Sequence, residues 1–179
     1  LAKGLIHSNN IIATKVFLAT GANTVVDFAR RCHLPGPFPP YPSLALGCTD
    51  STVVATAGAF NIFANHGIYV QPHLITWIKN AHGKKVWNHT PNKEKITPWH
   101  VTSQVTHVLR LTMENVKRRM PHLWVNSEVI GKTGTTNDAR TCWFVGSTPR
   151  YTTAVYLGCD DNRPLGTELT AVHNALPLW

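Results

Sequence analysis

Three strand-like runs follow one another in the last third of the sequence, and this feature restricts the fold most. They are EVIGKTGTT, TCWFVGS and YTTAVYLGC, within residues 128–159. Their β-branched and aromatic residues are typical of strands, and the segment TPR between the second and third has the length of a hairpin turn. We therefore expect the runs to form adjacent antiparallel strands.

The earlier part of the chain begins with helical spacing of apolar residues. A short helix is expected over Asn10–Ala19 with Gly21 as its end, and Asn23 should cap a second helix that ends before Pro35. The proline cluster LPGPFPPYPS at residues 34–43 cannot form a regular element. We interpret it as a long loop inside one domain, in preference to a linker between two.

Two more helices are expected further along. One should begin at Asp50 or Ser51 and end at Gly67, and a long one should begin at Thr97 with Pro98 in its first turn. Between them, GIYVQP and LITWIK resemble strands, and NAHGKK supplies a glycine turn. Helices first and strands last, without regular alternation, indicate an α+β fold and not a parallel Rossmann-type sheet.

Composition restricts the number of domains and the class of partner. The chain has 179 residues, 43% hydrophobic and 15% charged, so we expect residues 1–179 to form a single domain or part of one. The formal charge of +8 would suit an anionic partner, but Lys and Arg nowhere form a compact run interleaved with aromatic residues. We expect a basic solvated surface and no nucleic acid partner; steeply salt-dependent binding to DNA would indicate otherwise.

The cysteines and histidines lack the spacing of metal ligands. Cys32, Cys48, Cys142 and Cys159 include no CxxC pair, and the ten histidines form no HExxH set. We expect neither a metal ion nor another cofactor. Cys142 and Cys159 could meet across a hairpin as a disulfide, although free buried thiols are commoner, and the sequence leaves both outcomes open.

No apolar run is long enough to cross a bilayer, and the N-terminal residues lack the features of a signal peptide. The sequence starts at Leu1 without an initiating methionine. We therefore expect a segment of a longer polypeptide.

The first strand-like run carries polar residues where a buried strand would carry apolar ones. Lys132 and Gly134 alternate with Thr133 and Thr135. A glycine weakens a strand unless another backbone or a ligand comes close there. The two threonine hydroxyls share one face of the strand, and donors near an ammonium group favour a carboxylate, while an edge strand offers an N–H to an oxyanion. The plainer interpretation is a lysine that points into water.

The sequence HSNN at residues 7–10 places Ser8 and Asn10 at Ser-x-Asn spacing ahead of a helix. Taken alone, this segment would be interpreted as a helix cap. Together with Lys-Thr-Gly, it matches two of the three motifs of β-lactamases and penicillin-binding proteins, of which the third is Ser-x-x-Lys.

Residues 131–166 resemble the equivalent region of class A penicillin-binding proteins, the bifunctional peptidoglycan synthases. The resemblance extends to HSNNIIATKVF, to residues 41–75 and to the closing ALPLW, so it covers nearly the whole chain in order. It implies a β-lactamase/transpeptidase-like fold, an antiparallel sheet flanked by helices. Here the fold would be incomplete, because the N-terminal strands and the Ser-x-x-Lys helix would precede Leu1.

The resemblance implies a D,D-transpeptidase that cross-links peptidoglycan stem peptides through a serine acyl-enzyme and binds β-lactam antibiotics. Ser8 would join the proton relay to the leaving group, and Lys132 would supply positive charge and orient Ser8. Asn10 would hold the amide of the donor peptide. The parent would lie in the periplasm or on the extracellular face of the bacterial inner membrane, anchored by an N-terminal helix outside this chain.

The same resemblance assigns substrate binding to the strand. Thr133 and Thr135 would bind the terminal carboxylate of the donor or of a β-lactam, and the Thr135 N–H would contribute to the oxyanion hole. Gly134 and Thr136 complete the substrate-binding stretch.

The motif that would carry the nucleophile is missing, because no serine is followed three residues later by lysine. We expect the nucleophile on an upstream part of the same polypeptide, and we expect this chain alone to be inactive. An alternative is a β-lactam-sensing or catalytically inactive scaffold domain of the same fold. A serine β-lactamase is disfavoured, because no Glu-x-x-Leu-Asn pattern lies between Ser8 and Lys132.

Overall fold

The computed structural model describes residues 1–123, 128–166 and 169–179. Its α-helices are α1 (Ala2–Ile6), α2 (Asn10–Thr20), α3 (Ala22–Arg31), α4 (Val53–Ala64), α5 (Trp99–Arg119) and α6 (Ala175–Leu178). Its strands are β1 (Ile68–Val70), β2 (Trp77–Lys79), β3 (Lys85–Asn88), β4 (Lys93–Lys95), β5 (Ile130–Thr135), β6 (Thr141–Ser147) and β7 (Thr152–Gly158). Short 3₁₀ turns cover Pro42–Leu46, Pro121–Leu123 and Asn137–Ala139. The expected α+β class is confirmed.

The main sheet has the strand order β5-β6-β7 and is antiparallel throughout. Lys132 lies opposite Val145, and Thr135 lies opposite Cys142. The predicted set of three adjacent antiparallel strands is therefore confirmed, and β5 lies at one edge of this sheet.

The two faces of the sheet pack against different helices. One face packs against α5 and α6 in a cluster that includes Met113, Cys142, Phe144, Ala175 and Leu176. The other packs against α4 and α5 through Phe60, Leu109 and Ile130, with Val145 beside them. Because side chains alternate along a strand, these clusters show which face each β5 residue occupies.

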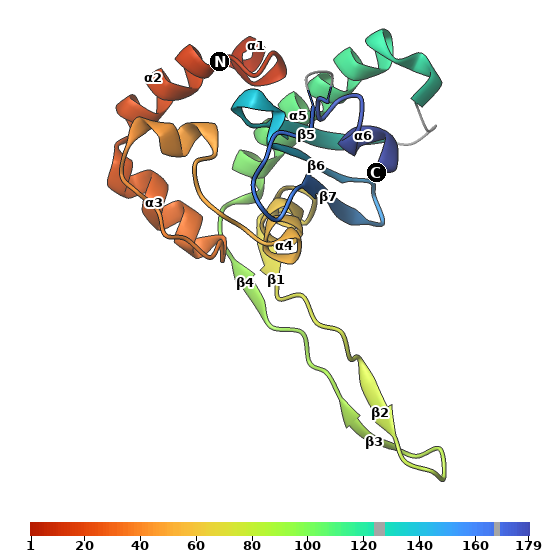
Figure 1. The fold of residues 1–179 in the computed structure, drawn as a ribbon. Helices are drawn as coiled ribbons and strands as arrows, with labels where there is room; N and C mark the ends of the chain where they lie inside the picture. Colours follow the sequence, from red (N-terminus) through yellow and green to blue (C-terminus); the bar gives the residue numbers. More distant parts are fainter. Residues whose placement is uncertain (124–127, 167–168) are drawn as a thin grey trace.

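Helices α1, α2 and α3 form a group beside the sheet, next to α5 (Figure 1). Gly21 alone joins α2 to α3, and its φ of 88° lies in the left-handed region that glycine tolerates. The prediction that Asn23 caps α3 was wrong, because the helix begins directly after Gly21 and includes Asn23. The predicted end of α2 near Gly21 is confirmed.

Two other helix starts differ from the prediction by a residue or two. Thr52, and neither Asp50 nor Ser51, caps α4, because its side chain accepts the N–H of Ala55 at 3.1 Å. Pro98 occupies the N-cap position of α5. Thr97 is buried, its N–H donates to the carbonyl oxygen of Gly67 at 3.3 Å, and no side chain caps the start of α5.

A long β-hairpin, which we call the arm (residues 71–92), extends away from the rest of the molecule (Figure 1). Strands β1 and β4 pair at its base, and β2 and β3 pair nearer its end. The turn in NAHGKK is confirmed, whereas the strand in LITWIK is limited to Trp77–Lys79. Strand β4 was not predicted, because its sequence Lys-Glu-Lys has no apolar residue.

All four cysteines have free thiols. The register of β6 and β7 places Cys142 opposite Leu157, so Cys159 lies beyond the end of β7 at Gly158. No disulfide joins Cys142 and Cys159.

Among the described residues, no single helix is sufficiently long and apolar to cross a membrane. The pair α2 and α3 meets the length and composition criteria only when taken together, and it is bent by 96°.

Candidate functional site

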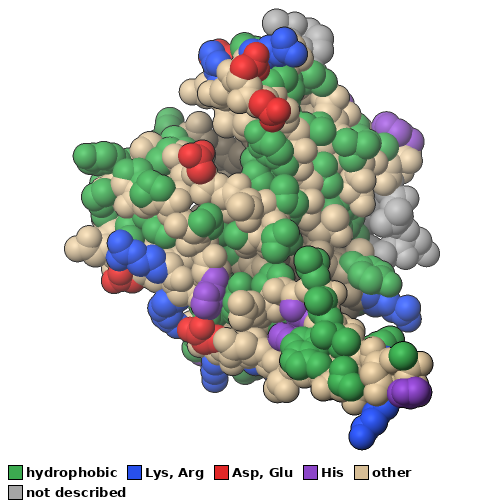
Figure 2. Space-filling model, turned by 60° about the horizontal axis from the view of Figure 1, so that its bottom comes forward, with side chains coloured by type: hydrophobic (Ala, Val, Ile, Leu, Met, Phe, Trp, Pro, Cys, Tyr) green, Lys and Arg blue, Asp and Glu red, His purple; other side chains and the backbone are tan. Residues whose placement is uncertain are grey.

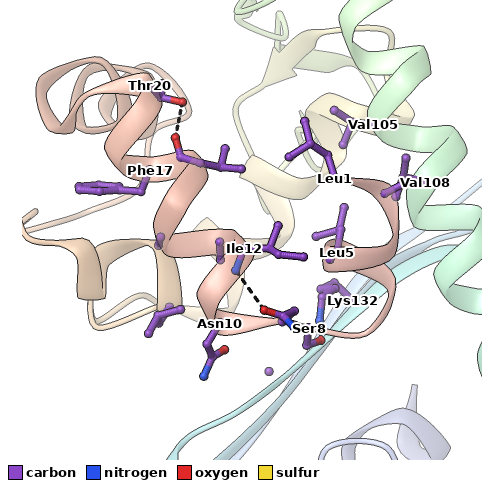
Figure 3. Close-up of a pocket in the computed structure, with 18 of the residues that line it drawn as sticks. Leu1, Leu5, Ser8, Asn10, Ile12, Phe17, Thr20, Val105, Val108 and Lys132 are labelled. Atoms are coloured by element: carbon purple, nitrogen blue, oxygen red, sulfur yellow. Dashed lines mark hydrogen bonds between the residues drawn. The ribbon is translucent and has the colours of Figure 1, made fainter.

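Lys132 and Ser8, which are 124 residues apart in sequence, are in direct contact. The Nζ of Lys132 donates a hydrogen bond to the Oγ of Ser8 at 2.5 Å. Lys132 projects from β5, and Ser8 lies in the short connection between α1 and α2 (Figure 3). Residues that the sequence singled out separately, by two different motifs, are therefore brought together.

The connection that carries Ser8 is fixed by its neighbour Asn9. The Asn9 side chain accepts the N–H of Ile12 at 3.0 Å and so caps α2. Ser8 itself has a φ of 51°, which is uncommon for a residue with a side chain. The capping interpretation of HSNN thus applies to Asn9, and the hydroxyl of Ser8 and the amide of Asn10 are left for other interactions.

Burial changes the electrostatics of Lys132. Desolvation lowers the pKa of its ammonium group below the usual 10.5. Its Nζ also donates to the carbonyl oxygen of Thr133 at 2.9 Å. Among the ion pairs formed by the described residues, none includes Lys132. The positive charge faces two neutral oxygens, which makes it an attractive position for an anionic group.

Lys132 and Ser8 lie in the wall of a cavity of about 1030 Å³. Asn10, Thr133, Gly134 and Thr135 line the same cavity. Much of the remaining wall is apolar and comes largely from α1, α2 and α5; it includes Leu1, Leu5, Ile12, Phe17, Val105 and Val108 (Figure 3). The sequence alone did not predict this apolar wall, because no short motif connects residues from separate helices.

The side chain of Thr135 lies on the sheet face opposite Lys132. Its Oγ1 accepts the N–H of Ala171 at 3.2 Å. It also hydrogen bonds Cys142, which only partly offsets the rise in the pKa of that thiol caused by burial. The hydroxyl of Thr135 therefore bonds to the C-terminal segment, whereas the alternation of Thr and Lys in the sequence had led us to expect it near the ammonium.

The backbone of β5 presents other groups to the open edge. The Thr136 N–H donates to the Thr141 oxygen at 3.1 Å, so it points toward β6. Because backbone groups alternate in direction along an antiparallel strand, the N–H groups of Thr133 and Thr135 point away from β6. Thr135 therefore directs its N–H to the sheet edge, where an oxyanion would need a donor.

Thr136 is used in the turn after β5. Its hydroxyl accepts the N–H of Thr141 at 2.8 Å, and the residue is not part of the cavity wall. Six of the seven predicted site residues line the cavity. Thr136 does not, although it directly follows Thr135 in the sequence.

A family model described as the penicillin binding protein transpeptidase domain matches residues 41–170. The chain belongs to this family. The matched range includes Lys132 and the threonines that follow it, whereas Ser8 and Asn10 lie before it. Class A penicillin-binding proteins were the family that the sequence resembled, and that identification is confirmed.

Curated relatives include the penicillin-binding proteins 1A of Aquifex aeolicus (strain VF5) and Neisseria flavescens. They are 33% and 29% identical to this chain over its whole length, which corresponds to 24% and 23% of their own. The chain therefore spans about a quarter of the length of these transpeptidase-family relatives.

Solved structures of the family share the fold. Penicillin-binding protein 1A from Haemophilus influenzae has a TM-score of 0.93 at 23% identity, over 100% of this chain and 33% of that one. PonA1 from Mycobacterium tuberculosis, in complex with penicillin V, has a TM-score of 0.88 at 24% identity, over 100% and 54%. The expected transpeptidase-like fold is confirmed.

Proposed function

We propose that residues 1–179 are part of a single D,D-transpeptidase domain, which cross-links peptidoglycan stem peptides and binds β-lactam antibiotics. The observation that carries the proposal is the hydrogen bond between Lys132 and Ser8, in a cavity that also includes Asn10 and the edge of β5. Within the family shown by the sequence match, this arrangement suits transfer of a peptide acyl group.

The first half of the reaction would form an acyl-enzyme. A serine oxygen supplied by an upstream part of the polypeptide attacks the penultimate D-alanyl carbonyl, the peptide bond breaks, and D-alanine leaves with the proton. Ser8 is placed to relay that proton, because its hydroxyl accepts from Lys132 and still has a hydrogen to donate. The hydrogen bond from Lys132 uses one lone pair of the Ser8 oxygen, so the hydroxyl hydrogen of Ser8 must point away from Lys132.

The second half would pass the acyl group to an amine of another stem peptide. The amine nitrogen forms the new amide bond, the ester bond to the serine breaks, and the proton that the amine loses returns to the serine oxygen. In both halves the carbonyl oxygen becomes negative, and the Thr135 N–H at the β5 edge is a suitable donor for it. Removal of one such donor typically lowers the rate about a hundredfold or more.

The donor would be recognised through its terminal carboxylate and its amide. A carboxylate is favoured beside the desolvated ammonium of Lys132, because no ion pair among the described residues neutralises this charge. Thr133 lines the same cavity and would contact the carboxylate from there. The side-chain amide of Asn10 can both donate to and accept from a peptide amide. A β-lactam with a carboxylate offers the same groups, which supports β-lactam binding at this site.

The upstream part of the same polypeptide is the proposed partner that completes the site. The sequence contains no Ser-x-x-Lys motif, and the apolar cavity wall is suited to bury a segment that carries one. Accordingly, we infer that this chain alone is inactive, and that the parent works in the periplasm or on the extracellular face of the inner membrane.

Fluorescent penicillin labelling of the full-length parent tests this proposal. Lys132→Ala should lower the second-order labelling rate by about a hundredfold, while Lys15→Ala, which removes an exposed lysine of α2, should leave it unchanged. Thermal unfolding of each variant checks that the fold is kept. Labelling of Lys132→Ala at the wild-type rate would exclude the role given to this lysine.

A further inference from the structure

The arm exposes more apolar surface than any function described above explains. Residues 71–88 are all exposed, and the part of the arm beyond its base extends away from the rest of the molecule. Its exposed large apolar side chains, with their exposed fractions, are Leu74 (102%), Ile75 (54%), Trp77 (46%), Ile78 (46%), Val86 (59%) and Trp87 (44%). Figure 2, in which the arm comes forward, shows these hydrophobic side chains gathered together.

Such a hairpin is poorly suited to remain in water. A two-stranded hairpin without a covering layer is at best marginally stable. Contiguous exposed apolar side chains on soluble proteins mark interaction sites. Tryptophan is also enriched among the residues that contribute most binding energy at protein interfaces.

The apolar side chains point to both sides of the hairpin. Ile78 lies opposite Trp87 in the β2–β3 register, so these two share one face. Trp77 neighbours Ile78 along the strand and therefore lies on the other face. A flat surface would cover only one of them, whereas a groove would enclose both.

The charge of the arm is entirely positive. Residues 71–92 contain Lys79, Lys84 and Lys85 but no aspartate or glutamate. The Nζ of Lys79 and of Lys85 lie 4.8 Å and 5.7 Å from the centroid of the Trp77 ring, so the cations and the apolar surface are one unit. A partner surface that complements the arm in charge would therefore be acidic.

The positive charge and the two apolar faces of the arm distinguish between possible binding partners. The arm of a second copy carries the same three lysines and no acidic residue, so two arms would repel each other. Vertical insertion into a bilayer is also disfavoured, because the polar residues 79–85 at the tip would have to pass beyond the tryptophans into the hydrocarbon. A protein groove meets both the apolar and the charged requirement.

We propose that the arm docks into a groove on a separate protein, with apolar walls around Trp77, Ile78 and Trp87 and carboxylates where Lys79, Lys84 and Lys85 end. This docking is independent of the transpeptidase site, since no arm residue lines its cavity.

Photo-crosslinking of the full-length parent in its own cells tests this interface. The photoreactive p-benzoylphenylalanine replaces Trp87 in one variant and Ile78 in another, and the crosslinked peptides are sequenced by mass spectrometry. Both positions should yield the same peptide region of one other protein, with aspartate or glutamate in or beside it. The same replacement at Tyr151, which is 70% exposed and outside the arm, should not yield that peptide.

A charge-reversal series separates docking from chance contact. Lys79→Glu, Lys84→Glu and Lys85→Glu together should lower the crosslink yield about tenfold or more, and Lys residues in place of the partner's carboxylates should restore it. Penicillin labelling should be unchanged, which shows that the parent is folded. Crosslinks to lipid, to this protein itself or to an unrelated mixture of peptides would overturn the proposal, as would failure of the charge reversal to change the yield.

Discussion

Lys132 Nζ lies 2.5 Å from Ser8 Oγ and 2.9 Å from the carbonyl oxygen of Thr133, in a partly desolvated position at the edge of the sheet. This geometry holds a positive charge against two neutral oxygens. Burial opposes the charge and lowers the pKa of the ammonium, so the charge is available to an anion and is also easier to lose at high pH.

The lowered pKa predicts an alkaline limit to acylation. As the pH rises through the pKa of Lys132, the ammonium loses its proton, and acylation by a carboxylate-bearing penicillin should fall at a pH below the usual lysine value of 10.5. Lys132→Arg keeps its charge throughout this range. The acylation rate of the parent, measured against pH, should show this fall in the wild type and lose it in the arginine variant, even if the variant is slower. An identical alkaline fall in both would contradict the assignment.

Close packing of α1 against α2 sets the position of Ser8. A Cβ on Gly4 would lie 2.6 Å from Cγ2 of Ile12. Gly4→Ala should therefore separate the two helices, cost about 1–3 kcal/mol of stability and slow penicillin acylation of the parent. Adding Ile12→Ala removes the obstructing methyl groups, so the double variant should be more active than the two single effects combined predict. Purely additive effects would show that this contact does not position the serine.

The turn at Gly67 should be among the least tolerant positions in the chain. Gly67 has a φ of 89°, and a Cβ there would lie 2.0 Å from the carbonyl oxygen of Thr97. Gly83 has a φ of 77° but nothing within 4 Å of that position, which makes it a matched control. Gly83→Ala should cost about 1–2 kcal/mol of unfolding free energy from backbone strain alone, and Gly67→Ala should cost more than about 3 kcal/mol. Thermal unfolding of the two variants in the parent gives the comparison; equal losses would mean that the Thr97 contact is relaxed.

The cysteines should differ in reactivity. Burial raises the pKa of the Cys32 thiol to about 11, whereas Cys48 is exposed. Because the thiolate is the reactive form, iodoacetamide near neutral pH should modify Cys48 much faster than Cys32. Peptide mass spectrometry after timed alkylation measures both rates, and denaturant should remove the difference. Fast modification of Cys32 in the native protein would contradict its burial.

The sequence was most informative where local patterns coincide with tertiary structure. The strand pattern of residues 128–159 predicted the antiparallel sheet, since β-branched runs and a short turn leave few other pairings. The motifs around Ser8 and Lys132 predicted residues that meet in space. The predictions of helix caps were less accurate. Asn9, Asn10 and Asn23 have the same side chain, so the sequence alone does not show which of them is a cap. The start of α3 is set by the one-residue junction at Gly21.

Other features depend on contacts that no local pattern records. The hydroxyl of Thr135 is bonded to the N–H of Ala171, and only the folded position of the C-terminal segment makes that contact. The cavity wall joins residues of α1, α2 and α5, so its apolar character is invisible in any one of them. The exposure of Trp77 likewise depends on the position of the arm in the fold, since tryptophan side chains are more often packed.

The most direct test of the account is a double-mutant cycle of Ser8→Ala and Lys132→Ala on the second-order rate of penicillin acylation of the full-length parent. If the two side chains act as one unit, each single variant should be on the order of a hundredfold slower, and the double variant little slower than either. Wild-type rates in the single variants, or losses that multiply in the double variant, would contradict it.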